Sequence, residues 1–257
     1  MLITRVIPVL LLRRRSLVKS VKFRNPTYVG DPINTVRIFN EREVDEIVIL
    51  DIEASTKNAE PQFDLLEEIA SEAFMPLAYG GGVKSVSHAR EIFRRGAEKV
   101  VINTSACESP TLISELSSEF GAQSIVVSID VKRNWLGGYR VACRQARVST
   151  NKNPIEWAKA VQAYGAGEIL LTSVERDGTF LGYDLQLVSS VASAVNIPVI
   201  ACGGAGSLVH AREVVLQAGA AAAAAGSLFV FQGSHRAVLV NYPKRELLDQ
   251  LFTESNH

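Results

Sequence analysis

GGGVKSVSHAREIFRRGAEKVVINTS, from Gly80 to Ser105, occurs a second time in this chain as GGAGSLVHAREVVLQAGAAAAAAGS, from Gly203 to Ser227. Each copy has a Gly-Gly pair, a short helix containing His-Ala-Arg-Glu, a Gly-Ala pair, an apolar strand and a small polar end. The copies lie about half a chain length apart, which predicts two fused halves of about residues 1–122 and 123–257. Glycine-rich strand ends that open helices bind anions readily, because the first amides of a helix are unpaired.

Apolar runs of strand length alternate with amphipathic segments along the whole sequence. The runs are apolar throughout, as expected for a parallel sheet that is covered on both faces. Eight such units in 257 residues favour a single closed (β/α)8 TIM barrel over a doubly wound open sheet, because two halves of four units close symmetrically. The expected strands are 3–12, 46–52, 76–80, 99–103, 124–130, 168–174, 197–203 and 221–227.

The composition is ordinary for a soluble globular protein. The formal net charge is +0, so neither nucleic acid nor an acidic membrane is the expected partner. Cys107, Cys143 and Cys202 are far apart and show no metal-like spacing, so we expect free thiols in the cytoplasm and neither a metal nor a cofactor. The apolar start precedes its arginines, the reverse of a signal peptide, and is too short to span a bilayer.

One connection is longer than an ordinary strand-to-helix loop. Residues 132–153 follow the fifth expected strand and contain WLGGYRVACR with a Gly137-Gly138 turn. Apolar and aromatic residues around such a turn predict a small hairpin over the mouth of the barrel.

Polar residues stand where several of the apolar strands end. The carboxyl ends of the strands carry the active site in barrels of this type. A single aspartate at a strand end is equally well explained as a helix cap. The convergence of several on one face favours a site, formed by Asp51, Asn103, Asp130, Thr172 and Asp177.

Both halves pair a Gly-Gly turn with a small polar end on the next strand. The alternative interpretation is that the glycines only form tight turns. The matched pairing predicts a substrate with a phosphate or similar group at each end, held by Gly81, Gly82, Asn103 and Thr104 in one half and Gly203, Gly204, Gly226 and Ser227 in the other. The Arg13–Arg15 run would lie in the first loop at the mouth, either as an anion contact or as a solvated charge run.

The chain resembles the cyclase subunit of imidazole glycerol phosphate synthase over nearly its whole length, and also the related isomerase of histidine biosynthesis. The motifs are LDIEAS, GGGV, RGAEKVVINTSA, VVSIDVKR, GAGEILLTSVERDGT, GYD and GGAG, and GAGEILLTS followed by RDGT favours the cyclase. The resemblance implies a lyase that acts on a phosphorylated small molecule. It places Lys19, Asp51 and Asp130 at catalytic positions and adds Asp177 and Gly178 to the phosphate-binding set.

In that family, ammonia comes from a glutaminase subunit at the N-terminal face of the barrel, enters through a ring of four charged residues and crosses the core. The resemblance places this ring at Arg5, Glu46, Lys99 and Glu168. Each residue stands at the start of a different expected strand, away from the chemistry, and the set has two charges of each sign. Unconnected strand-end charges are the alternative interpretation.

The first strand departs from the family pattern. The family reads close to LDVKDGRVVKG where this chain reads LLLRRRSLVKS, so Leu11 replaces an essential catalytic aspartate. Leucine cannot transfer a proton, and losing one acid–base partner costs roughly 10²–10⁴-fold in rate. Glu53 is a candidate substitute for the missing carboxylate.

Three interpretations follow from this departure. The first is a divergent paralogue that works with a glutaminase and a third, amidotransferase enzyme in acetamidino-sugar formation for bacterial surface polysaccharides. The second is a genuine cyclase of histidine biosynthesis with a rearranged acid. The third is a non-catalytic scaffold that activates a glutaminase and passes ammonia to another protein.

Overall fold

Eight parallel strands close into a barrel in the computed structural model, which describes residues 4–233 and 236–253. Each strand pairs with its neighbour in chain order, and β12 pairs with β1 to complete the circle. The expected (β/α)8 barrel is therefore confirmed. The barrel strands are β1 (Arg5–Arg13), β4 (Ile47–Asp51), β5 (Leu77–Gly80), β6 (Lys99–Ile102), β7 (Ile125–Arg133), β10 (Glu168–Ser173), β11 (Val199–Cys202) and β12 (Ala222–Ala225).

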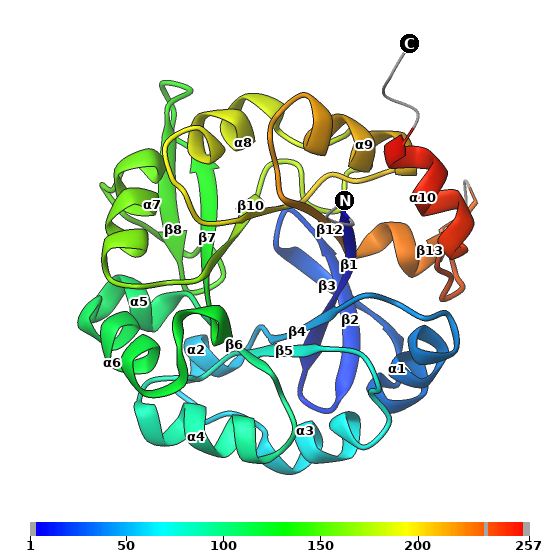
Figure 1. The fold of residues 1–257 in the computed structure, drawn as a ribbon, viewed down its shortest axis with the longest axis horizontal. Coiled ribbons are helices and arrows are strands. Elements are labelled where there is room, and N and C mark those ends of the chain that lie inside the picture. Colours follow the sequence, from blue (N-terminus) through cyan, green and yellow to red (C-terminus); the bar gives the residue numbers. More distant parts are fainter. Residues whose placement is uncertain (1–3, 234–235, 254–257) are drawn as a thin grey trace.

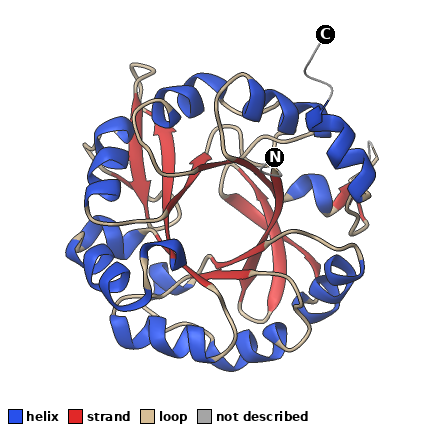
Figure 2. Ribbon diagram, in the orientation of Figure 1, coloured by secondary structure: helices blue, strands red, loops and turns tan. Residues whose placement is uncertain are grey.

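Helices cover the outside of the barrel as a ring (Figure 1), and Figure 2 shows the strands enclosed by them. Their buried faces pack on the strands through large side chains such as Phe39 and Leu66, which have no exposed surface. None of the helices in the described ranges is long and apolar enough to cross a membrane. The outer helices are α1 (Pro32–Glu41), α3 (Phe63–Ala70), α4 (Val86–Arg94), α6 (Thr111–Phe120), α7 (Pro154–Ala163), α8 (Leu185–Ala192), α9 (Leu208–Leu216) and α10 (Arg245–Thr253).

The repeated sequence produces the same local structure twice. Ser85 caps α4 by accepting a hydrogen bond from the amide of His88, and Ser207 caps α9 by accepting one from the amide of His210. The two histidine rings also bond to the glycine-rich turns, at the Gly82 carbonyl and the Gly206 amide. The histidines of the repeat therefore hold the turn against the helix.

Antiparallel hairpins extend the first strand of each half. In the segment 132–153, β7 pairs with β8 (Tyr139–Cys143), which pairs with β9 (Val148–Ser149). In the first half, β1 pairs with β2 (Ser16–Val21), which pairs with β3 (Arg24–Gly30). The sequence indicated only a loop at the second place, so the β1–β2–β3 extension corrects that interpretation.

The interior of the barrel is filled by a layer of apolar side chains. This layer contains Ile7, Val48, Val126 and Leu170 together with the small side chains of Ala222 and Ala224. Leu11 and Leu50 pack on it from the carboxyl end of the barrel. The layer separates a charged cluster at the strand starts from a polar pocket at the strand ends.

Candidate active site at the carboxyl ends of the strands

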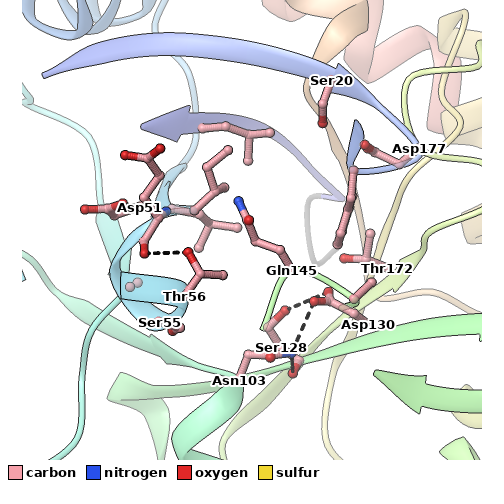
Figure 3. A pocket seen from close by; sticks show the side chains of 18 of the residues that line it. Ser20, Asp51, Ser55, Thr56, Asn103, Ser128, Asp130, Gln145, Thr172 and Asp177 are labelled. Carbon is pink, nitrogen blue, oxygen red and sulfur yellow. Dashed lines mark hydrogen bonds between the residues drawn. The ribbon is translucent and has the colours of Figure 1, made fainter. Parts of the chain in front are cut away.

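A cavity of about 860 Å³ opens at the carboxyl ends of the strands. Its walls come from both halves of the barrel and from both hairpin extensions, and Figure 3 shows its polar side chains from close by. Most of the residues expected at the site line this cavity: Lys19, Asp51, Gly81, Gly82, Asn103, Thr104, Asp130, Thr172, Asp177, Gly226 and Ser227. Gly178, Gly203 and Gly204 are not among its lining residues.

Asp130 is a buried carboxylate on β7. Its oxygens accept hydrogen bonds from the Asn103 amide at 3.3 Å and the Ser128 hydroxyl at 3.4 Å (Figure 3). Burial, and to a smaller extent the negative charge of Asp177, raises the pKa of Asp130 to about 7. A group with this pKa can accept or donate a proton at neutral pH.

Lys19 reaches into the cavity from β2, and only 5% of its surface is exposed. Its ammonium donates a hydrogen bond to the Val9 carbonyl. Burial lowers the pKa of Lys19 to about 8, although the negative charge of Asp177 opposes this shift. A Cβ at Gly226 would lie 2.3 Å from the Lys19 Nζ, so glycine at this position leaves room for the ammonium.

Asp177 completes a cluster of groups that titrate near neutral pH. Its removal from water raises the pKa of Asp177 to about 6, against the opposing charge of Lys19. Two carboxyl groups and one amine with pKa values between about 6 and 8 therefore share one cavity. Perturbed titrating groups in a cavity are the usual sign of an acid–base site.

Asp51 is held differently from the other acidic residues. Its Oδ1 accepts hydrogen bonds from the amides of Glu53 and Ala54 at 2.9 and 3.2 Å, where the short helix α2 (Ala54–Lys57) begins. Its Oδ2 accepts one from the Gln62 side chain at 2.7 Å. These donors explain the residue as a structural cap, which was the alternative interpretation of a strand-end aspartate.

Leu11 on β1 and Asp130 on β7 occupy matching positions in the two halves of the barrel. The match follows from the register in which each strand pairs with its two neighbours. Four strand pairings separate β1 from β7 in each direction around the barrel, so the two residues belong to opposite walls. Leu11 and Leu50 give the first wall an apolar surface. The cavity thus has a carboxyl group at this position on one wall and a leucine at the matching position on the other.

Glu53 lines the cavity but is bound by two cations. Its carboxylate lies 2.7 Å from Lys57 and 2.9 Å from Arg13, and the hydrogen bond from Lys57 lowers the pKa of Glu53. A carboxylate held in this way is a poor proton donor at neutral pH, which argues against it as a replacement for the aspartate lost at position 11.

The Arg13–Arg15 run does not act as a unit. Arg13 lines the cavity, while Arg15 pairs with Glu68 at 2.6 Å and Arg14 sits in the hairpin turn with a φ of 58°. Only one of the three arginines therefore stands where an anion in the cavity could meet it.

The two expected phosphate sites are unequal. In the first half, Gly81 and Gly82 line the cavity beside Asn103 and Thr104, where α5 (Thr104–Glu108) begins. In the second half, a Cβ at Gly204 would lie 2.2 Å from the Gly182 carbonyl, because residues 176–183 pack over this turn.

The remaining glycines of the second half show the same close packing. Gly178 lies against the Ser20 carbonyl and Gly203 against the Ser173 carbonyl, with Cβ approaches of 2.3 and 2.7 Å. Of the phosphate-binding residues expected in the second half, Asp177, Gly226 and Ser227 line the cavity.

A closed ring of ion pairs lies at the opposite end of the barrel. Arg5 contacts Glu46 at 2.5 Å and Glu168 at 2.7 Å. Lys99 contacts Glu46 at 2.9 Å and Glu168 at 2.8 Å. The four residues that the sequence singled out are therefore in mutual contact at the strand starts.

Several lining residues were not anticipated from the sequence. Gln145, Ala146 and Arg147, in the turn between β8 and β9, line the cavity together with Phe23 and Arg24 of the first extension. Figure 3 shows the Gln145 side chain among the polar residues of the cavity. Gln145 and Ala146 have positive φ values without being glycine, so the usual turn signal is missing there.

The fold and cavity together define a (β/α)8-barrel protein with a cavity of titratable groups at the carboxyl ends of its strands. Within this class, the chain belongs to the histidine biosynthesis protein family, whose sequence pattern matches residues 5–236. It resembles a protein of Pseudomonas aeruginosa provisionally named imidazole glycerol phosphate synthase subunit hisF2, with 51% identity over 95% of this chain and 98% of that one.

Two further relatives carry the same kind of name. A protein of Leptospira borgpetersenii, provisionally named imidazole glycerol phosphate synthase subunit HisF, is 45% identical over 98% of this chain and all of its own length. An imidazole glycerol phosphate synthase subunit HisF of Clostridium botulinum is 42% identical over 96% of this chain and 98% of its own. These likenesses place the chain among the HisF-type subunits.

Proposed function

We propose that this chain is the cyclase-type subunit of a glutamine-dependent complex. It accepts ammonia from a glutaminase docked at the N-terminal face and delivers it through the barrel to a phosphorylated substrate at the carboxyl end. The observation that carries the proposal is the closed ring of Arg5, Glu46, Lys99 and Glu168 on the barrel axis, opposite the acid–base cavity. Each charge of the ring has two partners, so one contact can open while every charge keeps a partner, which is impossible in a lone ion pair.

The interior of the barrel supports this route. Between ring and cavity lie small apolar side chains, including Ala78, Ala222 and Ala224. An apolar interior admits neutral ammonia far more readily than ammonium, because a charged group is costly to remove from water. The route would therefore deliver the nucleophilic form.

The chemistry would belong to Asp130, Lys19 and Asp177. Asp130 would transfer protons to and from the substrate. The Lys19 ammonium would attract a phosphate group of the substrate. Asn103 and Thr104 at the start of α5, together with Gly226 and Ser227, would bind the phosphate groups. The unpaired amides of such helical starts attract anions.

Leu11 argues against the cyclase reaction of histidine biosynthesis. A cyclase of histidine biosynthesis would need two opposed carboxylates, and the position opposite Asp130 holds Leu11. We therefore favour a paralogue whose partner is a third, amidotransferase enzyme in acetamidino-sugar (O-antigen) formation. The retained Asp130 and Lys19 are the observations that favour the second candidate, a genuine cyclase.

The first experiment separates these two candidates. Ammonium and the ribulotide substrate of the histidine pathway are supplied to the purified protein, and imidazole glycerol phosphate is followed beside an Asp-bearing cyclase. We expect turnover roughly 10²–10⁴-fold below that enzyme, and an increase in the Leu11→Asp variant. Turnover equal to the Asp-bearing enzyme would rule out the divergent paralogue.

The second experiment tests the ring and the scaffold alternative in the complete complex. Lys99→Ala should uncouple glutamine hydrolysis from product formation, whereas Arg37→Ala, which removes an exposed ion pair with Glu72, should not. Unchanged coupling in Lys99→Ala would remove the ring from the route. Asp130→Asn should abolish product formation, and an unchanged rate would instead establish a non-catalytic scaffold.

A further inference from the structure

Helix α5 is fastened to the end of β8 at a junction that brings two cysteines together. The amide of Arg144 donates a hydrogen bond to the Thr104 hydroxyl at 3.1 Å, and the Arg144 guanidinium contacts the Glu108 carboxylate at 2.6 Å. Cys143 directly precedes Arg144, and Cys107 lies between Thr104 and Glu108 on the helix. Residues 104, 107 and 108 lie on one face of α5, so the contacts of Arg144 with Thr104 and Glu108 place Cys143 beside Cys107, and both thiols are free.

The two thiols differ in a way that suits oxidation chemistry. Cys107 is partly exposed, and the Lys152 ammonium donates a hydrogen bond to its carbonyl at 3.3 Å. Interaction with the Cys143 thiol lowers the pKa of Cys107, while burial and the charges of Asp130 and Glu108 oppose this shift. Cys143 is buried, and the interaction with Cys107 raises the pKa of the Cys143 thiol. A partly exposed thiol with a lowered pKa beside a second thiol is the arrangement found in redox-sensing proteins.

We propose that Cys107 and Cys143 form a reversible disulfide when the protein meets a hydroperoxide. The Cys107 thiolate attacks one peroxide oxygen, the O–O bond breaks, and the leaving hydroxide takes up a proton to form water. The Cys143 sulfur then attacks the resulting sulfenic acid, loses its proton and displaces a second water as the S–O bond breaks. Two thiols are oxidised and one hydrogen peroxide is reduced to two waters.

The bridge would act on the cavity from two sides. Cys107 lies on the five-residue helix whose first turn presents Asn103 and Thr104 to the cavity. Cys143 is followed by Arg144, Gln145 and Ala146, with φ values of 53°, 57° and 55°, and the last two line the cavity. Closing a bond of about 2 Å must draw these segments together, so the oxidised cavity differs in shape from the reduced one.

Mass spectrometry of the intact protein tests the site independently of the proposed function. Hydrogen peroxide should lower the mass by two hydrogens, dithiothreitol should reverse the change, and peptide mapping should join Cys107 to Cys143. Cys202→Ser, which keeps both bridging thiols, should behave like the wild type, whereas Cys107→Ser and Cys143→Ala should not form the bridge. Three remaining free thiols in the oxidised wild type, or a bridge that includes Cys202, would overturn the proposal.

Titration with inorganic phosphate tests the effect on the cavity. We expect the oxidised wild type to bind phosphate several-fold more weakly than the reduced protein, and oxidised Cys107→Ser to be unaffected. Equal affinity of the bridged and reduced wild type would overturn the link between bridge and cavity. Circular dichroism of each variant verifies that it is folded before the comparison.

Discussion

The pKa of Asp130 is raised to about 7 because the carboxyl group has lost most of its hydration. Between pH 3.8 and about 7, the carboxyl group is protonated in the folded chain and ionised in the unfolded chain. Stability is therefore lost as the pH rises through this range, and the loss is complete above the folded pKa. The raised pKa that would allow Asp130 to transfer protons near neutral pH therefore lowers the stability of the fold.

Replacing Asp130 by asparagine should relieve this destabilisation, and more so at higher pH. Relative to wild type, the free energy of unfolding of Asp130→Asn should rise by about 3 kcal/mol between pH 5 and pH 8. Urea denaturation at the two pH values measures the change. The control Asp64→Asn, at a side chain that is 86% exposed, should show the same change in stability as the wild type between the two pH values. If Asp130→Asn also changes as the wild type does, the raised pKa of Asp130 is wrong.

Gly226 is required by a side chain and not by its own backbone conformation. A methyl group there would meet the Lys19 ammonium, so Gly226→Ala should destabilise the protein by about 1–3 kcal/mol through overpacking. Gly138→Ala, with nearest contacts of 3.4 Å, should have a smaller effect in the same urea titration. Combining Gly226→Ala with Lys19→Ala should remove most of the loss, and additive losses would show that Lys19 is not the obstacle.

At the residue scale, the sequence identified most of the cavity lining but not what each residue does. Asp130 and Asp51 both stand at the ends of apolar strands. Only the structure shows that the Asp51 carboxylate accepts hydrogen bonds from two backbone amides and from the Gln62 side chain. Gly81 and Gly203 occupy matching positions and both lie against the end of the preceding strand, yet only Gly81 lines the cavity. Contacts between segments far apart in the chain leave no local pattern to read.

At the scale of single elements, the repeat predicts equal energetics for α4 and α9. Each begins with a serine whose hydroxyl accepts a hydrogen bond from the third helical amide. Ser85→Ala and Ser207→Ala should each cost about 1 kcal/mol, with additive effects because the caps are far apart. Thermal unfolding measures both, and Ser190→Ala in the middle of α8 is the control, expected to cost less. Strongly unequal losses would show that the halves differ locally.

The β1–β2–β3 extension shows why an element can escape prediction. Its turns place Arg14, Lys22 and Phe23 at φ values of 53–60°, where glycine or asparagine is usual. Strand β3 also contains Pro26, which speaks against a strand in a sequence. The barrel strands were predictable because burial on both faces makes them apolar throughout, and this edge extension has no such pattern.

At the scale of the whole molecule, the charged ring joins four strands and both halves. Lys99→Met would leave Glu46 and Glu168, with side chains 3% and 11% exposed, sharing Arg5 alone. We expect a loss of about 3–5 kcal/mol because a buried charge then lacks its partner. Arg37→Met, at the exposed pair with Glu72, should cost at most about 1 kcal/mol. Similar losses in urea denaturation would show that the ring does not bind the halves together.

The ring also bears on how such a barrel could have arisen. Glu46 and Glu168 are counterparts, since each directly precedes the first residue that pairs with the next strand, Ile47 with β5 and Ile169 with β11. Arg5 and Lys99 are not, because by strand register their counterparts are Ser124 and Ala222. Two identical half-barrels could supply only paired copies of each charge. A ring with one arginine and one lysine therefore could form only after the sequences of the two halves had diverged at these positions.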